Sequence, residues 1–322
     1  MPLTTITDLL ATDLQAVNQT IIRCLESRVE VINKIGHYMI ESGGKRIRPL
    51  VVLLSAKACD AKNDTPITMA AIIEFIHTAT LLHDDVVDGS TLRRGRPTAN
   101  RVWDNPTAVL VGDFLYSRAF QMIVSLNSMD CMRIMAEATN VIAEGEVLQL
   151  AHRYQPDIDE SRYLNVIRFK TAKLFEAAAQ LGAILANQPR EIELTLAQYG
   201  MHIGTAFQLV DDVLDYQAAN ESWGKNIGDD LAEGKATLPL IYALKKAPEA
   251  QAKLIRQAIQ HGSLEDLSVI QEAIVSTGAI DYTLAAAKKE IALAKEALAM
   301  LPSSRYKDAM LELATFAISR KN

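Results

Sequence analysis

Apolar residues recur at intervals of three and four along almost the whole chain, which places them on one face of an α-helix. The first case covers residues 6–40, where two such runs follow each other. Further runs cover residues 66–83, 106–126, 130–150, 160–187 and 191–216, and helical periodicity continues from Leu238 onward. No stretch alternates between apolar and polar residues for long enough to predict a β-strand. The pattern therefore predicts an all-α fold.

Glycine and proline mark the ends of the predicted helices. Gly43 and Gly44 interrupt the pattern before Pro49, which suits the first turn of the next helix. Only 15 Gly and 10 Pro occur in 322 residues, so the composition favours helix nearly everywhere. No stretch has the composition of a linker. Residues 1–322 are therefore predicted to form a single domain, a helical bundle.

Two of the predicted helices end in the same cluster of aspartates. The residues are Asp84, Asp85 and Asp88 in HDDVVD, and Asp211, Asp212 and Asp215 in QLVDDVLD. Aspartates four positions apart lie one turn from each other on nearly the same helix face. They repel unless a cation lies between them, and Mg²⁺ suits this position because it takes hard oxygen ligands and leaves room for substrate phosphates. A solvated helix end explains one such cluster equally well, but the repetition predicts two helices that face each other across one metal-diphosphate site.

Basic residues near the first cluster have two possible explanations each. Lys45 and Arg48 are three positions apart at a helix start and could hold one anion together, although a solvated basic turn would look the same. His77 lies two turns before Asp84 on almost the same face, so it either packs in the core or contacts a phosphate.

Two loops follow the aspartate clusters. Residues 89–105 carry Arg93, Arg94 and Arg96. Residues 219–239 form the longest polar, glycine-containing loop, and a loop of this length beside a site is a candidate lid. Inside the helices, Lys170 is expected on a solvated face, and the polar run that includes Glu146 is given no chemistry.

Charge and cysteine content exclude several classes of function. A net charge of −6 argues against nonspecific nucleic-acid binding, which needs a basic surface, whereas metal-bound aspartates would still accept an anionic substrate. The 3 cysteines lack metal-binding spacing, which predicts reduced thiols. The N-terminal stretch lacks the features of a signal peptide, and no run approaches the roughly 18 apolar residues of a membrane span. We therefore predict a cytoplasmic protein with no transmembrane segment.

Taken together, the motifs resemble those of the trans-polyprenyl diphosphate synthases. The resemblance rests on GGKRIRP, LLHDDVVD followed by RRG, the pair Lys170 and Thr171, QLVDDVLD, and the elements GKN and GKAT, in this order over residues 40–240. The whole chain also resembles bacterial members that make an octaprenyl (C40) diphosphate. The family's reaction begins when an allylic diphosphate, here farnesyl diphosphate, loses its diphosphate. The double bond of isopentenyl diphosphate attacks the resulting carbocation and a proton is lost. The product would become the side chain of a respiratory quinone.

The resemblance also implies roles for residues of this chain. The catalytic residues would be Asp84, Asp85, Asp88, Asp211, Asp212, Asp215 and Lys170. Asp84, Asp88, Asp211 and Asp215 would be the metal ligands, with about three Mg²⁺ ions around the allylic diphosphate. That diphosphate would also contact Arg93, Lys170, Thr171, Gln208 and Lys225. Isopentenyl diphosphate, without metal, would be held by Lys45, Arg48, His77 and Arg94, and Lys235 is a further substrate-binding residue. The released diphosphate can accept the proton, so no side-chain base is needed.

Residues just before the first cluster predict the product length. In this family, bulky residues there block the pocket, whereas Ala79 and Thr80 are small, and no insertion interrupts DDVVD. The product should therefore be longer than C20. A helix of about 20 residues spans about 30 Å, near the reach of eight isoprene units. The end of the pocket is expected at Met122, Ile123 and Met135.

Other functions stay open at this point. The same chemistry could give another product length, such as C45 or shorter. A class I terpene cyclase normally carries an Asn, Ser and Glu pattern in place of the second aspartate cluster, and a noncatalytic subunit of a heteromeric synthase usually lacks some aspartates that are present here. The family further implies a homodimer and a transient membrane contact at product release.

Overall fold

The computed structural model describes residues 3–217 and 227–319, and this part of the chain is almost entirely helical. The longer helices are α2 (Ala11–Leu25), α3 (Glu30–Glu41), α4 (Ile47–Ala58), α5 (Thr65–Val87), α7 (Asn105–Ser125), α8 (Met129–His152), α10 (Lys173–Leu185), α11 (Arg190–Leu214), α14 (Glu249–His261), α15 (Leu267–Ser276), α16 (Ala279–Ala297) and α17 (Arg305–Ser319). The shorter elements are α1 (Leu3–Leu9), β1 (Leu92–Arg93), β2 (Arg96–Pro97), α6 (Ala99–Val102), α9 (Glu160–Ile167), the π-helical turn η1 (Arg168–Ala172), α12 (Asp229–Ala232), α13 (Leu238–Lys246) and the 3₁₀ turn η3 (Leu298–Met300). The all-α prediction is confirmed.

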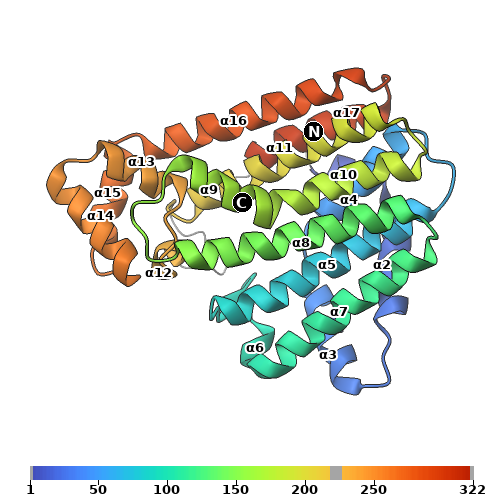
Figure 1. Cartoon of the computed structure of the whole chain (residues 1–322), viewed down its shortest axis with the longest axis horizontal. Helices are drawn as coiled ribbons and strands as arrows, with labels where there is room; N and C mark the ends of the chain where they lie inside the picture. The colour runs from blue at the N-terminus through green and yellow to red at the C-terminus, as the bar shows by residue number, and fades with distance from the viewer. Residues whose placement is uncertain (1–2, 218–226, 320–322) are drawn as a thin grey trace.

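The aspartate-bearing helices α5 and α11 belong to one packed bundle. α5 packs against α4 and α7, α11 packs against α10 and α16, and α10 also packs against α4. Figure 1 shows α10 running alongside both α8 and α5, with α12 to α15 gathered at one end of the molecule. The larger hydrophobic core includes Phe175 and Tyr199, while a smaller one includes Ile255, Ile270 and Ile274. The single-domain organisation of residues 1–322 remains a prediction.

Helix α5 bears on the prediction that no segment spans a membrane. By length and composition alone it could cross a membrane, because its few polar residues do not lower its mean hydropathy enough to exclude it. Within its apolar window, 67% is buried inside the protein. A buried core helix passes the same test, and the packing of α5 between α4 and α7 accounts for its apolar character.

The structure differs from the predicted elements where the breaks are short. Residues 6–40 form parts of α1, α2 and α3 rather than two helices, and residues 160–187 are divided by η1. A two-strand hairpin pairs Arg93 with Arg96, and the two residues of its turn, Arg94 (φ 54°) and Gly95 (φ 74°), are left-handed. Strands of two residues are too short to produce an alternating pattern. The hairpin holds Arg93 and Arg94 next to the end of α5.

Candidate active site

A cavity of about 1380 Å³ lies between the C-terminal ends of α5 and α11. Both aspartate clusters contribute to its wall, Asp84 and Asp88 from α5 and Asp211 and Asp215 from α11 and its cap. The C-terminal end of a helix is the negative end of its dipole, and neither helix has a basic residue in its last turn. Carboxylates at these ends are unfavourable unless cations lie beside them, so each needs a cation from another part of the chain or from a bound ligand.

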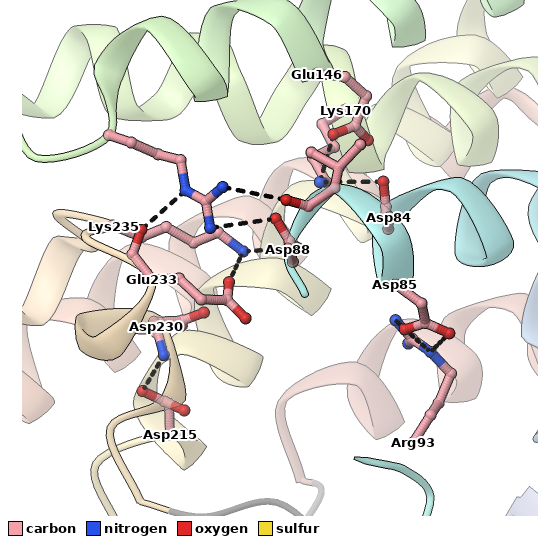
Figure 2. Close-up of polar contacts among 12 residues, drawn as sticks. Asp84, Asp85, Asp88, Arg93, Glu146, Lys170, Asp215, Asp230, Glu233 and Lys235 are labelled. Carbon is pink, nitrogen blue, oxygen red and sulfur yellow. Dashed lines mark hydrogen bonds and ion pairs between the residues drawn. The ribbon is translucent and has the colours of Figure 1, made fainter. Parts of the chain in front are cut away.

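Two lysines supply positive charge beside the first cluster (Figure 2). Lys170 Nζ lies 2.5 Å from Glu146 Oε2 and 3.5 Å from Asp84 Oδ1. Lys235 Nζ lies 3.2 Å from Asp88 Oδ2 and also pairs with Glu233. Burial by itself would raise the pKa of Asp88, but Lys235 and Lys170 outweigh it and the pKa is lowered. Asp88 is therefore held as a carboxylate.

Asp85 faces away from the cavity. Its side chain is buried and accepts hydrogen bonds from Arg93 Nε at 2.9 Å and Arg93 Nη2 at 2.7 Å. Burial raises the pKa of Asp85, and Arg93 opposes this shift. Figure 2 shows the pair apart from the group around Asp88. Arg93 lines the cavity and Asp85 does not, so these hydrogen bonds fix the Arg93 side chain at the cavity wall.

Hydrogen bonds connect the second cluster to η1 and α9. Asp212 accepts from the hydroxyl of Tyr163 at 2.5 Å and from Gln208 Nε2 at 2.8 Å. The Gln208 Oε1 in turn accepts from the hydroxyl of Thr171 at 3.0 Å. Burial, with Asp230 nearby, raises the pKa of Asp212 to about 8. Thr171 and Gln208 are 37 positions apart in the chain, yet they lie on the same wall of the cavity.

A separate basic group, apart from Lys170 and Lys235, lines the same cavity. It consists of Lys45, Arg48, His77 and Arg94. Arg48 Nη1 lies 3.2 Å from His77 Nε2, and the Arg48 guanidinium lies 4.4 Å from the centre of the Phe175 ring. Burial lowers the pKa of Arg48 to about 10, and burial together with Arg48 lowers that of His77 well below its usual value. His77 is therefore neutral and Arg48 remains charged, which leaves a cationic surface suited to an anion.

The glycine before Lys45 lets Arg94 approach this surface. A Cβ added at Gly44 would lie 2.9 Å from Arg94 Nη1, so any side chain there would push the guanidinium away. Arg46, which caps α4 at φ 48°, pairs with the buried Glu74. This ion pair anchors the start of α4, from which Lys45 and Arg48 project.

Sequence reasoning missed several residues of the site. Glu146 pairs with Lys170, and burial and Asp84 raise the pKa of Glu146 to about 7. Tyr163, Arg153 and Glu233 also line the cavity. The signal for Glu146 was its place beside Gly145 in a polar run of α8, but without the position of η1 it had no assignable partner. Lys170 lies in the cavity wall, which agrees with the diphosphate contact that the resemblance implies and not with the solvated face expected from its helix alone.

The remaining predicted residues have mixed placements. Lys225 lies outside the described residues, as does part of the candidate lid 219–239, whose described part contains α12 and Lys235. Thr80 lines the cavity. The other residues assigned to chain length are buried in the core and do not line the cavity: Ala79, Met122, Ile123 and Met135. Their role in chain length stays a prediction.

The oxygen donors of the two clusters fit a magnesium site. Asp84, Asp88, Asp211 and Asp215 offer the hard carboxylate ligands that Mg²⁺ takes. Within residues 3–217 and 227–319, no group of at least three His, Cys, Asp or Glu side chains is arranged around one metal position. Further ligands would have to be water and phosphate oxygens, which Mg²⁺ usually keeps.

Gly145 of α8 allows the close approach of η1 that brings Lys170 to the cavity. A Cβ at this position would lie 2.6 Å from the Lys170 backbone nitrogen and 2.8 Å from Phe169 Cβ. We expect Gly145→Ala to lower the free energy of unfolding by about 1–3 kcal/mol, because backbone has to move. We also expect kcat/KM to fall, since Lys170 is displaced from the cavity wall. Chemical denaturation and kcat/KM would test this. Ala136 is exposed on the same helix, so Ala136→Ser should change neither the free energy of unfolding nor kcat/KM. Wild-type stability and activity in Gly145→Ala would contradict the expected clash.

Known proteins match the chain over nearly its whole length. Residues 29–276 match the polyprenyl synthetase family. The chain is 50% identical over 321 residues to octaprenyl diphosphate synthase of Escherichia coli (strain K12), covering 99% of each chain. It is 46% identical over 311 residues to all-trans-nonaprenyl-diphosphate synthase (geranyl-diphosphate specific) of Rhodobacter capsulatus, covering 96% of this chain and 95% of the other.

Solved structures share the fold. A polyprenyl synthase from Caulobacter crescentus CB15, crystallised with calcium and isoprenyl diphosphate, superposes with a TM-score of 0.96 at 44% identity, covering 99% of this chain and 98% of the other. A decaprenyl diphosphate synthase from Rhodobacter capsulatus superposes with a TM-score of 0.93 at 41% identity, covering 98% of each. The predicted helical fold of the isoprenoid synthase type is thus confirmed.

Proposed function

The chain belongs to the polyprenyl synthetase family and is a long-chain trans-prenyltransferase, and we propose that it extends farnesyl diphosphate with isopentenyl diphosphate units to an octaprenyl (C40) diphosphate. The observation that carries this proposal is that two aspartate clusters and a separate basic group share one cavity. Loss of diphosphate from an allylic substrate needs metal and fixed cations. Isopentenyl diphosphate keeps its diphosphate during the reaction, so that group needs only to be bound. The two halves of the cavity match these two demands.

The aspartate half would bind the allylic diphosphate. The family is Mg²⁺-dependent, and Mg²⁺ bound by Asp84, Asp88, Asp211 and Asp215 would neutralise the departing diphosphate; we propose about three ions. Lys170 and Lys235 lie beside Asp84 and Asp88, respectively, and would also interact with the negatively charged diphosphate. Fixed cations of this kind stabilise developing negative charge without having to reorganise.

The basic half would hold isopentenyl diphosphate. Lys45, Arg48 and Arg94 supply the positive charge, and neutral His77 orients Arg48. The apolar side chains of Leu81 and Phe207 line the cavity and would exclude water from the carbocation. The released diphosphate would accept the proton that is lost after each addition.

Product analysis tests this function. The purified chain is incubated with farnesyl diphosphate, labelled isopentenyl diphosphate and Mg²⁺, and the dephosphorylated products are sized by chromatography. We expect one C40 product that EDTA abolishes. A C45 or C15–C20 product would replace the proposed length but keep the chemistry, and no product from the folded chain would favour a noncatalytic subunit.

Release of the finished product is expected to limit turnover. Each added five-carbon unit gains about 4 kcal/mol of burial, at about 0.8 kcal/mol per CH₂, so affinity grows with chain length. Detergent should therefore raise the steady-state rate several-fold after an initial burst of product. The control is a limiting supply of isopentenyl diphosphate, under which short products form and detergent should have little effect. An unchanged steady-state rate would mean that release is not the slow step.

We further propose that the protein is a cytoplasmic homodimer that contacts a membrane transiently at product release and supplies the side chain of a quinone. The dimer proposal is supported by exposed apolar residues on α7 and α8, among them Leu110, Val124 and Val147. Light scattering coupled to size-exclusion chromatography would test it, and a monomer at micromolar concentration would contradict it.

A further inference from the structure

The end of α8 is joined to the turn that carries Lys235. Arg153 caps α8, and its Nε donates a hydrogen bond to the Glu233 carbonyl oxygen at 2.9 Å. The next residue, Tyr154, donates its backbone N–H to the Gly234 carbonyl oxygen at 2.8 Å. Two consecutive residues of one segment therefore hold two consecutive carbonyls of the other.

The close contact depends on unusual backbone on both sides. Tyr154 is left-handed at φ 61°, and Gly234 at φ 71°. A Cβ added at Gly234 would lie 2.4 Å from the Tyr154 ring, so the ring packs directly on the glycine backbone. A non-glycine residue with positive φ costs energy and persists only where its surroundings impose it. The surroundings here are the turn at residues 233–235.

The guanidinium of Arg153 also reaches the first aspartate cluster. Its Nη2 lies 3.5 Å from Asp88 Oδ1, and its Nη1 lies 3.5 Å from the carbonyl oxygen of Val87, at the last turn of α5. A cation at this position meets both the carboxylate and the negative end of the helix dipole. One side chain therefore joins α8, the end of α5 and the turn at residues 233–235.

This junction places Lys235. Lys235 Nζ lies between Asp88 and Glu233, and Figure 2 shows these three side chains together. The Arg153 side chain is only 13% exposed, so its charge is largely removed from water and needs the partners that it has. Without Arg153, the turn would keep the backbone bond to Tyr154 and the Lys235–Asp88 ion pair, but the guanidinium would no longer join the Glu233 carbonyl to the end of α5.

We propose that Arg153 is a positioning residue that docks the turn at residues 233–235 onto the end of α5, so that Lys235 and Asp88 form one preassembled edge for the allylic diphosphate. This inference rests on the proposed function of the cavity. It assigns Arg153 to the allylic half alone, because none of its contacts involves Lys45, Arg48 or His77.

Arg153→Met removes the guanidinium and keeps most of the side-chain volume. We expect KM for farnesyl diphosphate to rise about tenfold, as for the loss of one hydrogen-bonded charge, while KM for isopentenyl diphosphate stays within about twofold. A second measurement does not use activity: the midpoint temperature of thermal unfolding is followed as inorganic pyrophosphate is added with Mg²⁺. The pyrophosphate concentration that gives half of the maximal shift should also rise about tenfold.

Two further variants complete the test. Arg133→Met removes an arginine of the same helix that is 51% exposed and pairs only with Asp130 among the residues described, and it should leave both measurements unchanged. Arg153→Lys keeps the charge near Asp88 but loses the planar donor to the Glu233 carbonyl. KM for farnesyl diphosphate and the pyrophosphate concentration at half-maximal shift should then each rise about threefold. If Arg153→Met does not fold, the KM values and the pyrophosphate response of Arg153→Lys test the inference instead.

The outcomes separate this inference from the proposed function. If Arg153 variants bind pyrophosphate with Mg²⁺ like the wild type, or raise both KM values equally, the inference is wrong even where the wild type elongates chains. If the wild type makes no product but its pyrophosphate response depends on Arg153, the elongation function fails and the positioning role stands.

Discussion

Asp84→Asn and Asp211→Asn are each expected to lower kcat by about 10²- to 10³-fold, comparable to the loss of one preorganised group that stabilises charge in a transition state. Each substitution takes one carboxylate from a different helix, so each weakens the binding of Mg²⁺ that would neutralise the departing diphosphate. Single-turnover assays with farnesyl diphosphate and saturating Mg²⁺ would measure the loss without interference from product release.

The same two variants should be at least as stable as the wild type. The aspartates stand at the negative ends of α5 and α11, where neither last turn carries a basic residue. Removing one charge there relieves an unfavourable interaction with the helix dipole, typically about 0.3–1 kcal/mol, which offsets the loss of the ion pair between Asp84 and Lys170. The thermal midpoint should therefore not fall. Asp130→Asn, an exposed aspartate of α8, is the matched control and should keep full activity. Full activity in either cluster variant would remove that cluster from the mechanism.

Ala79→Tyr is expected to shorten the product from C40 to about C15–C20, the largest change that one side chain should make to the product. Ala79 is completely buried one position before Thr80, which lines the cavity. A tyrosine ring at this position has to take its volume from the end of the cavity or from the core, and overpacking a core typically costs about 1–3 kcal/mol. The products would be sized by chromatography after dephosphorylation.

Two controls accompany this variant. Ala79→Ser is small and should keep the C40 product, and thermal unfolding would show that Ala79→Tyr is folded. A C40 product from the folded tyrosine variant would mean that the growing chain does not pass Ala79. The end of the pocket would then have to be sought away from Met122 of α7 and Met135 of α8, which are both buried in the core.

Local contacts in the chain account for what the sequence predicted well. Periodicity predicts helices because a helix buries residues three and four positions apart, and this relation holds without knowledge of the rest of the fold. The aspartate clusters could be recognised for the same reason, since their members are one helical turn apart. Exceptions were short features, such as the hairpin at Arg93 and the π-helical turn η1, which involve too few residues to leave a periodic signal.

The tertiary structure alone decided the partners of these residues. Asp85 and Asp88 belong to one cluster, yet Asp85 binds Arg93 and does not line the cavity, while Asp88 meets Lys235, 147 positions further along the chain. Glu146 gains a role only because Gly145 admits η1 and Lys170. Arg153 gains one only because α8 ends beside the Gly234 turn. Spacing along one helix determines which side chains share a face, but the packing of distant segments determines which charges meet, and that packing depends on the whole core.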